Sequence, residues 1–126
     1  MEIILTPDAT KPGGHYSQAT IHGGFIFISG QLPIDPSTGG KILGSIEEQT
    51  EAVLRNVKAI LEAAGSDIEN LLKVTVYVSD IGQWDQVNTV YAEFMGDHKP
   101  ARAIVPTREL HYGFKVEMDA IAAVPE

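Results

Sequence analysis

The sequence predicts a single α+β domain, residues 1–126, whose elements follow the order ββαβαββ. Two stretches on either side of a His-Gly-Gly turn have the pattern of a β-hairpin. Two longer stretches, 46–64 and 84–94, repeat apolar residues with the period of a helix, and a strand-like stretch follows each of them. Helices and strands therefore share one core.

The hairpin comes first in the chain. Residues 16–21 alternate in polarity, the turn lies at 22–24, and an apolar run at 25–28 leads to Ser29 and Gly30. The region 33–40 is dense in Pro, Asp and Gly and predicts a loop.

A capping box opens the first helix, because Ser45 is followed three residues later by Glu48. Apolar residues recur with helical spacing until Gly65, at Ile46, Val53, Leu54, Val57, Ile60, Leu61 and Ala64. Residues 73–79 then alternate with period two, which indicates a strand packed on one face.

Asp80 and Gln83 predict the start of the second helix. Its inward stripe comprises Trp84, Val87, Val90, Tyr91 and Phe94, and 96–100 ends it. Residues 101–105 and 116–122 are the last two predicted strands.

Two helices cover only one face of such a sheet, so the other face is expected to be open. We expect apolar side chains on that open face, including Phe25, Phe27, Val74 and Val76. An open apolar face predicts a homo-oligomer that covers it.

Composition narrows the possible functions. The net charge of −8 and the pI near 4.8 oppose nucleic-acid binding, which depends on lysine and arginine. The absence of cysteine excludes disulfides and cysteine nucleophiles. No apolar run is long enough to span a membrane, and the start does not resemble a secretory signal, so we expect a cytoplasmic protein without a membrane partner.

Arg102 is the most informative candidate residue, since it lies in the apolar run 100–105. A guanidinium in such a strand is costly unless it meets an anion, and its planar fork suits a carboxylate. Alternation places Arg102 with Ile104, and Glu117 with Asp119. If these strands face one cleft, Arg102 and Glu117 converge, either as a site or as a structural ion pair.

Other chemistry has weaker support in the sequence. The four histidines lack metal-ligand spacing, so we expect no metal site. The glycine pairs form no nucleotide-binding loop, and no serine lies in a nucleophile turn. Ser29 and Gly30 either end a strand or supply a backbone donor to a ligand. Tyr16 either packs against the core or lies at the rim of a pocket. Asn88 lies on the polar side of its helix.

Six segments taken in order resemble the YjgF/YER057c/UK114 family, also called the Rid family. These segments are 14–19, 28–33, 56–65, 87–88, 100–102 and 116–122, and together they extend over nearly the whole chain. The resemblance implies a chorismate-mutase-like α+β fold, assembled as a homotrimer with clefts between subunits. It also implies a cofactor-independent deaminase that hydrolyses 2-imino and 2-enamino acids, released by pyridoxal-phosphate-dependent dehydratases, to 2-oxo acids and ammonia.

The resemblance also implies roles for individual residues. Arg102 would bind the substrate carboxylate, and Glu117 would hold or activate water and move protons. The remaining pocket residues would be Tyr16, Ser29, Gly30, Asn88 and Ile104. Water addition to an electrophilic imine requires positioning and a proton relay rather than a protein nucleophile.

The chain departs from the family pattern at three positions. Many members have proline where it has His15, a small residue or cysteine where it has Ile104, and Leu-Pro where it has Leu110-His111. Ile104 would make the cleft narrower or more apolar, and His15 adds a titratable group near its mouth. The sequence therefore does not determine which side chain the substrate carries.

Two other functions remain as alternatives. One is a non-catalytic trimer that binds small carboxylates as a sensor, because Arg102 explains binding equally well. The other is the ribonuclease or translation-inhibitor role under which members of the family are often labelled, and the acidic charge argues against it.

Overall fold

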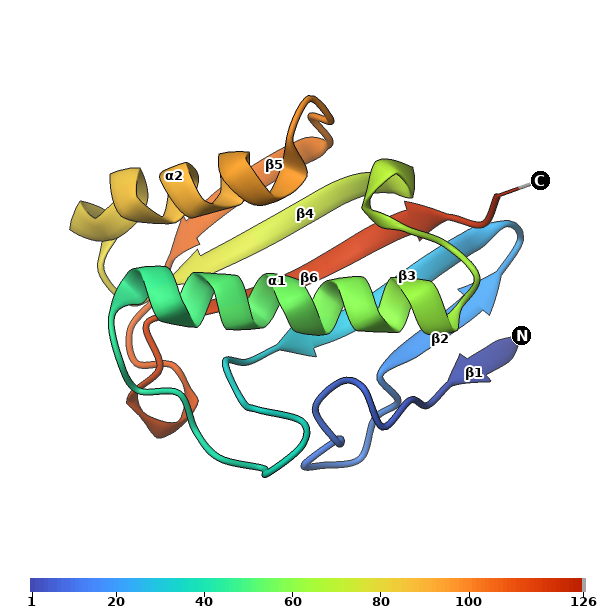
Figure 1. Ribbon diagram of the computed structural model, residues 1–126, viewed down its shortest axis with the longest axis horizontal. Coiled ribbons are helices and arrows are strands. Elements are labelled where there is room, and N and C mark those ends of the chain that lie inside the picture. Colours follow the sequence, from blue (N-terminus) through green and yellow to red (C-terminus); the bar gives the residue numbers. More distant parts are fainter. Residues whose placement is uncertain (126) are drawn as a thin grey trace.

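A six-stranded sheet and two helices make up the fold, and the computed structural model describes residues 1–125 (Figure 1). The strands are β1 (Glu2–Ile4), β2 (Ala19–His22), β3 (Phe25–Gln31), β4 (Leu71–Val78), β5 (Ala101–Pro106) and β6 (Val116–Ala123). The helices are α1 (Ile46–Ala63) and α2 (Trp84–Met95), with the short 3₁₀ turns η1 (Ile68–Asn70), η2 (Ile81–Gln83) and η3 (His111–Gly113). The predicted α+β class and the order of its seven elements are confirmed.

The structure adds β1, which the sequence did not predict. This strand has three residues, too few for a periodic pattern, and it is defined by its pairing with β2 in the register Ile3 with Thr20. The start of the second helix also differs, because Asp80 accepts a hydrogen bond from Gly82 N in η2 while α2 begins at Trp84 without a side-chain cap.

Local signals in the sequence account for the well-predicted elements. The Ser45 hydroxyl accepts a hydrogen bond from Glu48 N at 3.1 Å at the start of α1. Gly23 and Gly24 both have positive φ values, 59° and 83°, as a two-residue hairpin turn requires. His22 pairs with Phe25 across that turn, which fixes the register of the hairpin.

The sheet order is β1-β2-β3-β6-β4-β5, so the last strand of the chain lies at its centre. The neighbours β4 and β5 run parallel, and all other neighbours are antiparallel. The strand β5 forms one edge of the sheet. Both helices lie on the same face, with α1 across the middle of the sheet and α2 beside β4 and β5 (Figure 1).

The two faces of the sheet differ in solvent exposure, because helices cover only one of them. On the face away from the helices, Phe25 and Phe27 are 46% and 45% exposed. The placement of Val74 and Val76 on that open face was wrong, because both are buried beneath the helices at 1% and 0% exposure. The pairing of Val76 with Met118 places both on the helix-covered face, and alternation then sends Tyr77 to the open one.

No helix in the described part of the chain has the length and apolar character that crossing a membrane would require.

Candidate functional site

Arg102 is held in position by three side chains of helix α2. Its Nη1 donates a hydrogen bond of 3.0 Å to Asn88 Oδ1. Its Cζ lies 4.9 Å from the ring centre of Trp84 and 4.7 Å from that of Tyr91. Cation–π contacts with two rings and one hydrogen bond to a side-chain amide hold the guanidinium in place without neutralising its charge.

Arg102 has no carboxylate partner within the described chain. The ion pairs found among residues 1–125 are Arg55 with Glu51 and Lys58 with Asp67. The structural ion pair between Arg102 and Glu117, which the sequence left open, does not form within one chain. The positive charge is therefore available to an anion.

Apolar side chains surround the approach to this guanidinium. An open hollow of about 380 Å³ is lined by Ile81, Trp84, Arg102 and Ile104. Tyr91 is buried behind the arginine, and its hydroxyl makes no hydrogen bond within the described residues. Its burial raises the pKa of the Tyr91 phenol, while the charge of Arg102 opposes that shift. The phenol is thus a neutral donor near the guanidinium.

A β-bulge shapes the region around Glu117. The pairing of β3 with β6 shifts between Ile28 and Gln31, so Ser29 and Gly30 bulge out of the ladder. A Cβ atom added at Gly30 would collide with the Glu117 carboxylate. Glycine is therefore needed at position 30 because its missing side chain leaves room for this acid.

Glu117 has an altered acidity. Burial raises the pKa of its carboxyl group above the ordinary value, with the neighbouring Asp119 adding to the shift and His111 opposing it. Asp119 in turn accepts a hydrogen bond of 2.9 Å from the Tyr77 hydroxyl, which raises the pKa of that phenol. A carboxyl group that retains its proton more readily than usual is suited to acid–base chemistry near neutral pH.

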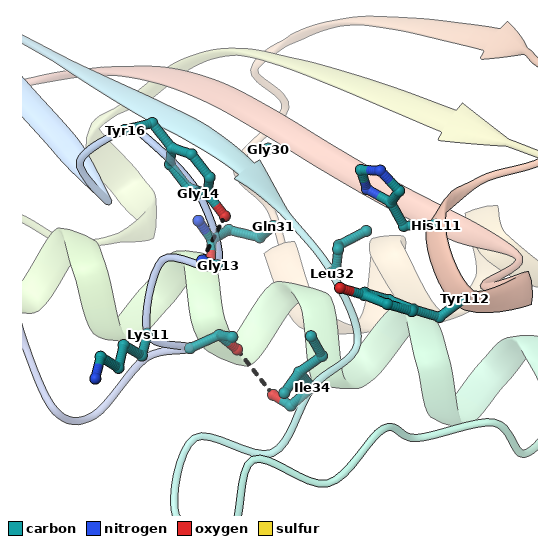
Figure 2. Close-up of a pocket in the computed structure, with 11 residues that line it drawn as sticks. Lys11, Gly13, Gly14, Tyr16, Gly30, Gln31, Leu32, Ile34, His111 and Tyr112 are labelled. Carbon is teal, nitrogen blue, oxygen red and sulfur yellow. Dashed lines mark hydrogen bonds between the residues drawn. The ribbon is translucent and has the colours of Figure 1, made fainter.

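Beside Gly30 lies a second hollow, with a volume of about 180 Å³. Figure 2 shows Tyr16 on one side of it and His111 with Tyr112 on the other. The Tyr16 hydroxyl accepts a hydrogen bond of 3.3 Å from Gly13 N, which holds the ring over the hollow. Ser29 is committed to the backbone, since its hydroxyl donates to Ser17 O at 2.6 Å.

Buried amide side chains hold the loops that form this second hollow. Gln18 accepts from Thr6 N at 2.7 Å and donates to the carbonyl oxygens of Thr6 and Thr10. Asn56 on α1 donates to Leu32 O at 3.2 Å and Ile34 O at 3.1 Å. Because a buried amide is costly when unpaired, these bonds fix the loops to the core.

The predicted site residues form two groups on opposite faces of the sheet. The strand β4 pairs with both neighbours, through Val74 with Arg102 and through Tyr77 with Glu117. Val74 and Tyr77 are an odd number of residues apart and point to opposite faces, so their partners do too. Arg102, Asn88 and Ile104 form one group on the helix-covered face. Glu117, Tyr16, Ser29 and Gly30 form the other, at the bulged end of β3.

Sequence reasoning missed three residues of these groups. Trp84 and Tyr91 were assigned to the packing stripe of α2, yet they also flank the guanidinium of Arg102. Their spacing relative to Asn88, at positions four before and three after it, was a usable signal, because such residues share one helix face. His111 was noted only as a departure, whereas the structure places it close enough to Glu117 to affect its acidity.

Comparisons with known sequences point to one protein family. Residues 6–124 match the family model described as endoribonuclease L-PSP. A RutC family protein from Pyrococcus horikoshii is 50% identical over 121 residues, which are 96% of each chain.

Solved structures show the same likeness. A Yersinia pestis protein described as a member of the conserved Rid family superimposes with a TM-score of 0.95 at 38% identity and covers 98% of both chains. Escherichia coli TdcF, solved with bound serine, gives a TM-score of 0.93 at 35% identity, again over 98% of both chains.

Proposed function

Because this chain belongs to the endoribonuclease L-PSP family, the family also known as YjgF or Rid, we propose that it hydrolyses 2-imino and 2-enamino acids to 2-oxo acids and ammonia. Such compounds, for example 2-aminoacrylate and 2-iminopropanoate, are reactive and carry one carboxylate. Pyridoxal-phosphate-dependent dehydratases would release them in the cytoplasm.

The observation that carries this proposal is the free, fixed guanidinium of Arg102. Two aromatic rings and Asn88 hold it in place, and no acid of the described chain neutralises it. The fork of an arginine binds a carboxylate through two parallel hydrogen bonds. Serine, the ligand bound to TdcF, also carries a carboxylate on its α-carbon, which supports a substrate of this size.

Glu117 is proposed as the group that handles protons. It takes a proton from water as the water oxygen bonds to the carbon of the iminium, and it then returns that proton to nitrogen. The carbon–nitrogen bond breaks while the new hydroxyl becomes a carbonyl and loses its proton to Glu117. One iminium and one water thus give one 2-oxo acid, one ammonia and one proton, and no metal or cofactor takes part.

The substrate requires both groups of residues, so we propose a homotrimer with sites between subunits. Arg102 and Glu117 lie on opposite faces of one sheet and cannot meet within a chain. The open face carries exposed Phe25 and Phe27, which association with a second copy would cover. One subunit would supply Arg102, Asn88 and Ile104, and its neighbour Tyr16, Ser29, Gly30 and Glu117.

A coupled assay tests the proposal. A dehydratase generates 2-aminoacrylate from serine, and its decay is followed with and without this protein. We expect acceleration by the wild type and a loss of at least about a hundredfold in kcat/KM with Arg102→Ala. Arg102→Lys, which keeps the charge but loses the fork, should also be impaired. No acceleration by the wild type, or equal acceleration by Arg102→Ala, would refute the proposal.

The same variants separate the alternatives. A sensor would bind pyruvate through Arg102 without accelerating decay, whereas in a deaminase Glu117→Gln abolishes turnover and spares pyruvate binding. The family description also names a ribonuclease. Cleavage of RNA that persists at high salt and in the Arg102→Ala variant would favour that activity instead, against the net charge of −8.

A further inference from the structure

His111 is held in place by an unusual piece of backbone. The turn η3 contains Tyr112 with φ of 58°, followed by Gly113 with φ of 74°. A positive φ is uncommon in a residue other than glycine and persists where surrounding contacts impose it. Here the Tyr112 ring packs edge-on against buried Phe114 at 5.7 Å, and Lys41 Nζ lies 4.6 Å from its centre. These contacts therefore fix the backbone from which the His111 side chain extends.

His111 lies beside Glu117 and at the edge of the hollow. His111 and Gly30 both line it (Figure 2). The Glu117 carboxylate lies against Gly30. His111 is exposed, whereas Glu117 is partly buried. The other ionisable groups near this carboxyl are Asp119 on its own strand and Tyr77 on β4. Neither carries a positive charge, so within one chain His111 is the neighbour able to offset the charge of the ionised acid.

We propose that His111 carries protons between the Glu117 carboxyl group and solvent, an inference that rests on the proposed imine hydrolysis. Each turnover leaves one proton on a Glu117 oxygen. That proton passes to an imidazole nitrogen of His111, directly or through one water, and Glu117 becomes a carboxylate again. The imidazolium then releases the proton to bulk water, and the next cycle begins.

The raised pKa of Glu117 bears on this transfer. Histidine is the side chain that ordinarily changes charge between pH 5 and 8. An ordinary carboxylic acid is a stronger acid than an imidazolium and gives its proton to an imidazole readily. Burial raises the pKa of Glu117 toward that of an ordinary imidazolium, so a proton can pass between two such groups in either direction. An exposed carboxyl of ordinary acidity would release its proton to water without help.

Two variants, His111→Ala and His111→Gln, test the inference. Each is assayed as an intact oligomer of the same size as the wild type. We expect kcat to fall about tenfold at pH 7 with KM nearly unchanged, because Arg102 still binds the carboxylate. Added imidazole should restore the rate of His111→Ala. His22→Gln is the matched control, since His22 lies at the hairpin turn, at the other end of β3 from Gly30. A wild-type kcat and pH profile in His111→Ala, or a loss that appears in KM and is not rescued by imidazole, would overturn the relay.

A second measurement separates this inference from the proposed function. Carbon-13 NMR follows the titration of the Glu117 carboxyl with and without His111. Removing an imidazolium should raise the pKa of Glu117, whether or not the protein is active. If the wild type fails to accelerate imine decay, the proposed function fails. If it does accelerate decay and the Glu117 titration is the same in both proteins, the relay alone is wrong.

Discussion

Glu117 illustrates how one residue gains its chemistry from its surroundings. Its neighbours in sequence, Lys115, Val116, Met118 and Asp119, predict only a strand with alternating faces. The raised pKa depends on burial beside the bulge of β3, and the bulge depends on Gly30 having no side chain. The sequence predicted position 30 either as a strand exit or as a backbone donor, whereas in the structure its missing side chain makes space for an acid.

The raised pKa makes a prediction about stability. Because the pKa of Glu117 in the folded protein lies above its unfolded value, the stability linked to this group is complete below the unfolded pKa. It is lost as pH rises through the folded pKa. Glutamine does not ionise, so Glu117→Gln should gain stability relative to the wild type between pH 4 and pH 8. Urea denaturation at both pH values measures this.

Glu62→Gln, a change at an exposed glutamate of α1, controls for the loss of one negative charge. A stability difference between Glu117→Gln and wild type that does not change with pH would contradict the assignment of burial as the cause.

At the scale of elements, helix α2 holds the Arg102 side chain in position. Its register places Trp84, Asn88 and Tyr91 one turn apart, on the side that faces β5. The sequence predicted this helix and its apolar stripe. The apolar pattern alone did not reveal that Trp84 and Tyr91 contact Arg102, because a ring that packs on leucine and one that packs on arginine have the same periodicity. Only the helix face that they share with Asn88 indicated such a contact.

This geometry predicts what happens when a carboxylate of the protein itself competes with the ligand for Arg102. Asn88→Asp keeps the shape of the side chain and places a carboxylate 3.0 Å from Arg102 Nη1. A charged hydrogen bond there should compete with the ligand and weaken binding of pyruvate or 2-oxobutanoate by roughly one to two orders of magnitude. Isothermal titration calorimetry measures the affinity.

Gln86→Glu adds the same charge at an exposed position of the same helix and is the matched control. Equal affinities for Asn88→Asp and Gln86→Glu would mean that Arg102 does not bind the carboxylate.

At the scale of the whole molecule, the two residue groups occupy opposite faces of one sheet. A single chain therefore presents Arg102, the proposed anion-binding residue, on one face and Glu117, the proposed proton-handling residue, on the other. Association through the open face is the proposed means of joining them, and it gives the exposed Phe25 and Phe27 a role.

Subunit mixing tests this arrangement. Arg102→Ala and Glu117→Ala, each inactive alone, are co-expressed so that mixed trimers form. In a cyclic trimer every mixed assembly has one site with both residues intact, so random mixing should restore about a quarter of wild-type activity. Mixed oligomers carrying two affinity tags can be isolated before assay. Mixed trimers without activity would contradict sites shared between subunits.

The sequence by itself determined the α+β class, the order of the main elements and the family, and it singled out Arg102 as a candidate anion-binding residue. Each of these depends on local features: a capping box, a glycine turn, apolar periodicity, or a charge within an apolar run. Tertiary structure alone decided that Val74 and Val76 are buried, that β1 exists, and that Arg102 and Glu117 face apart. Alternation gives the relative orientation of residues within one strand, whereas only strand pairing relates one strand to the next.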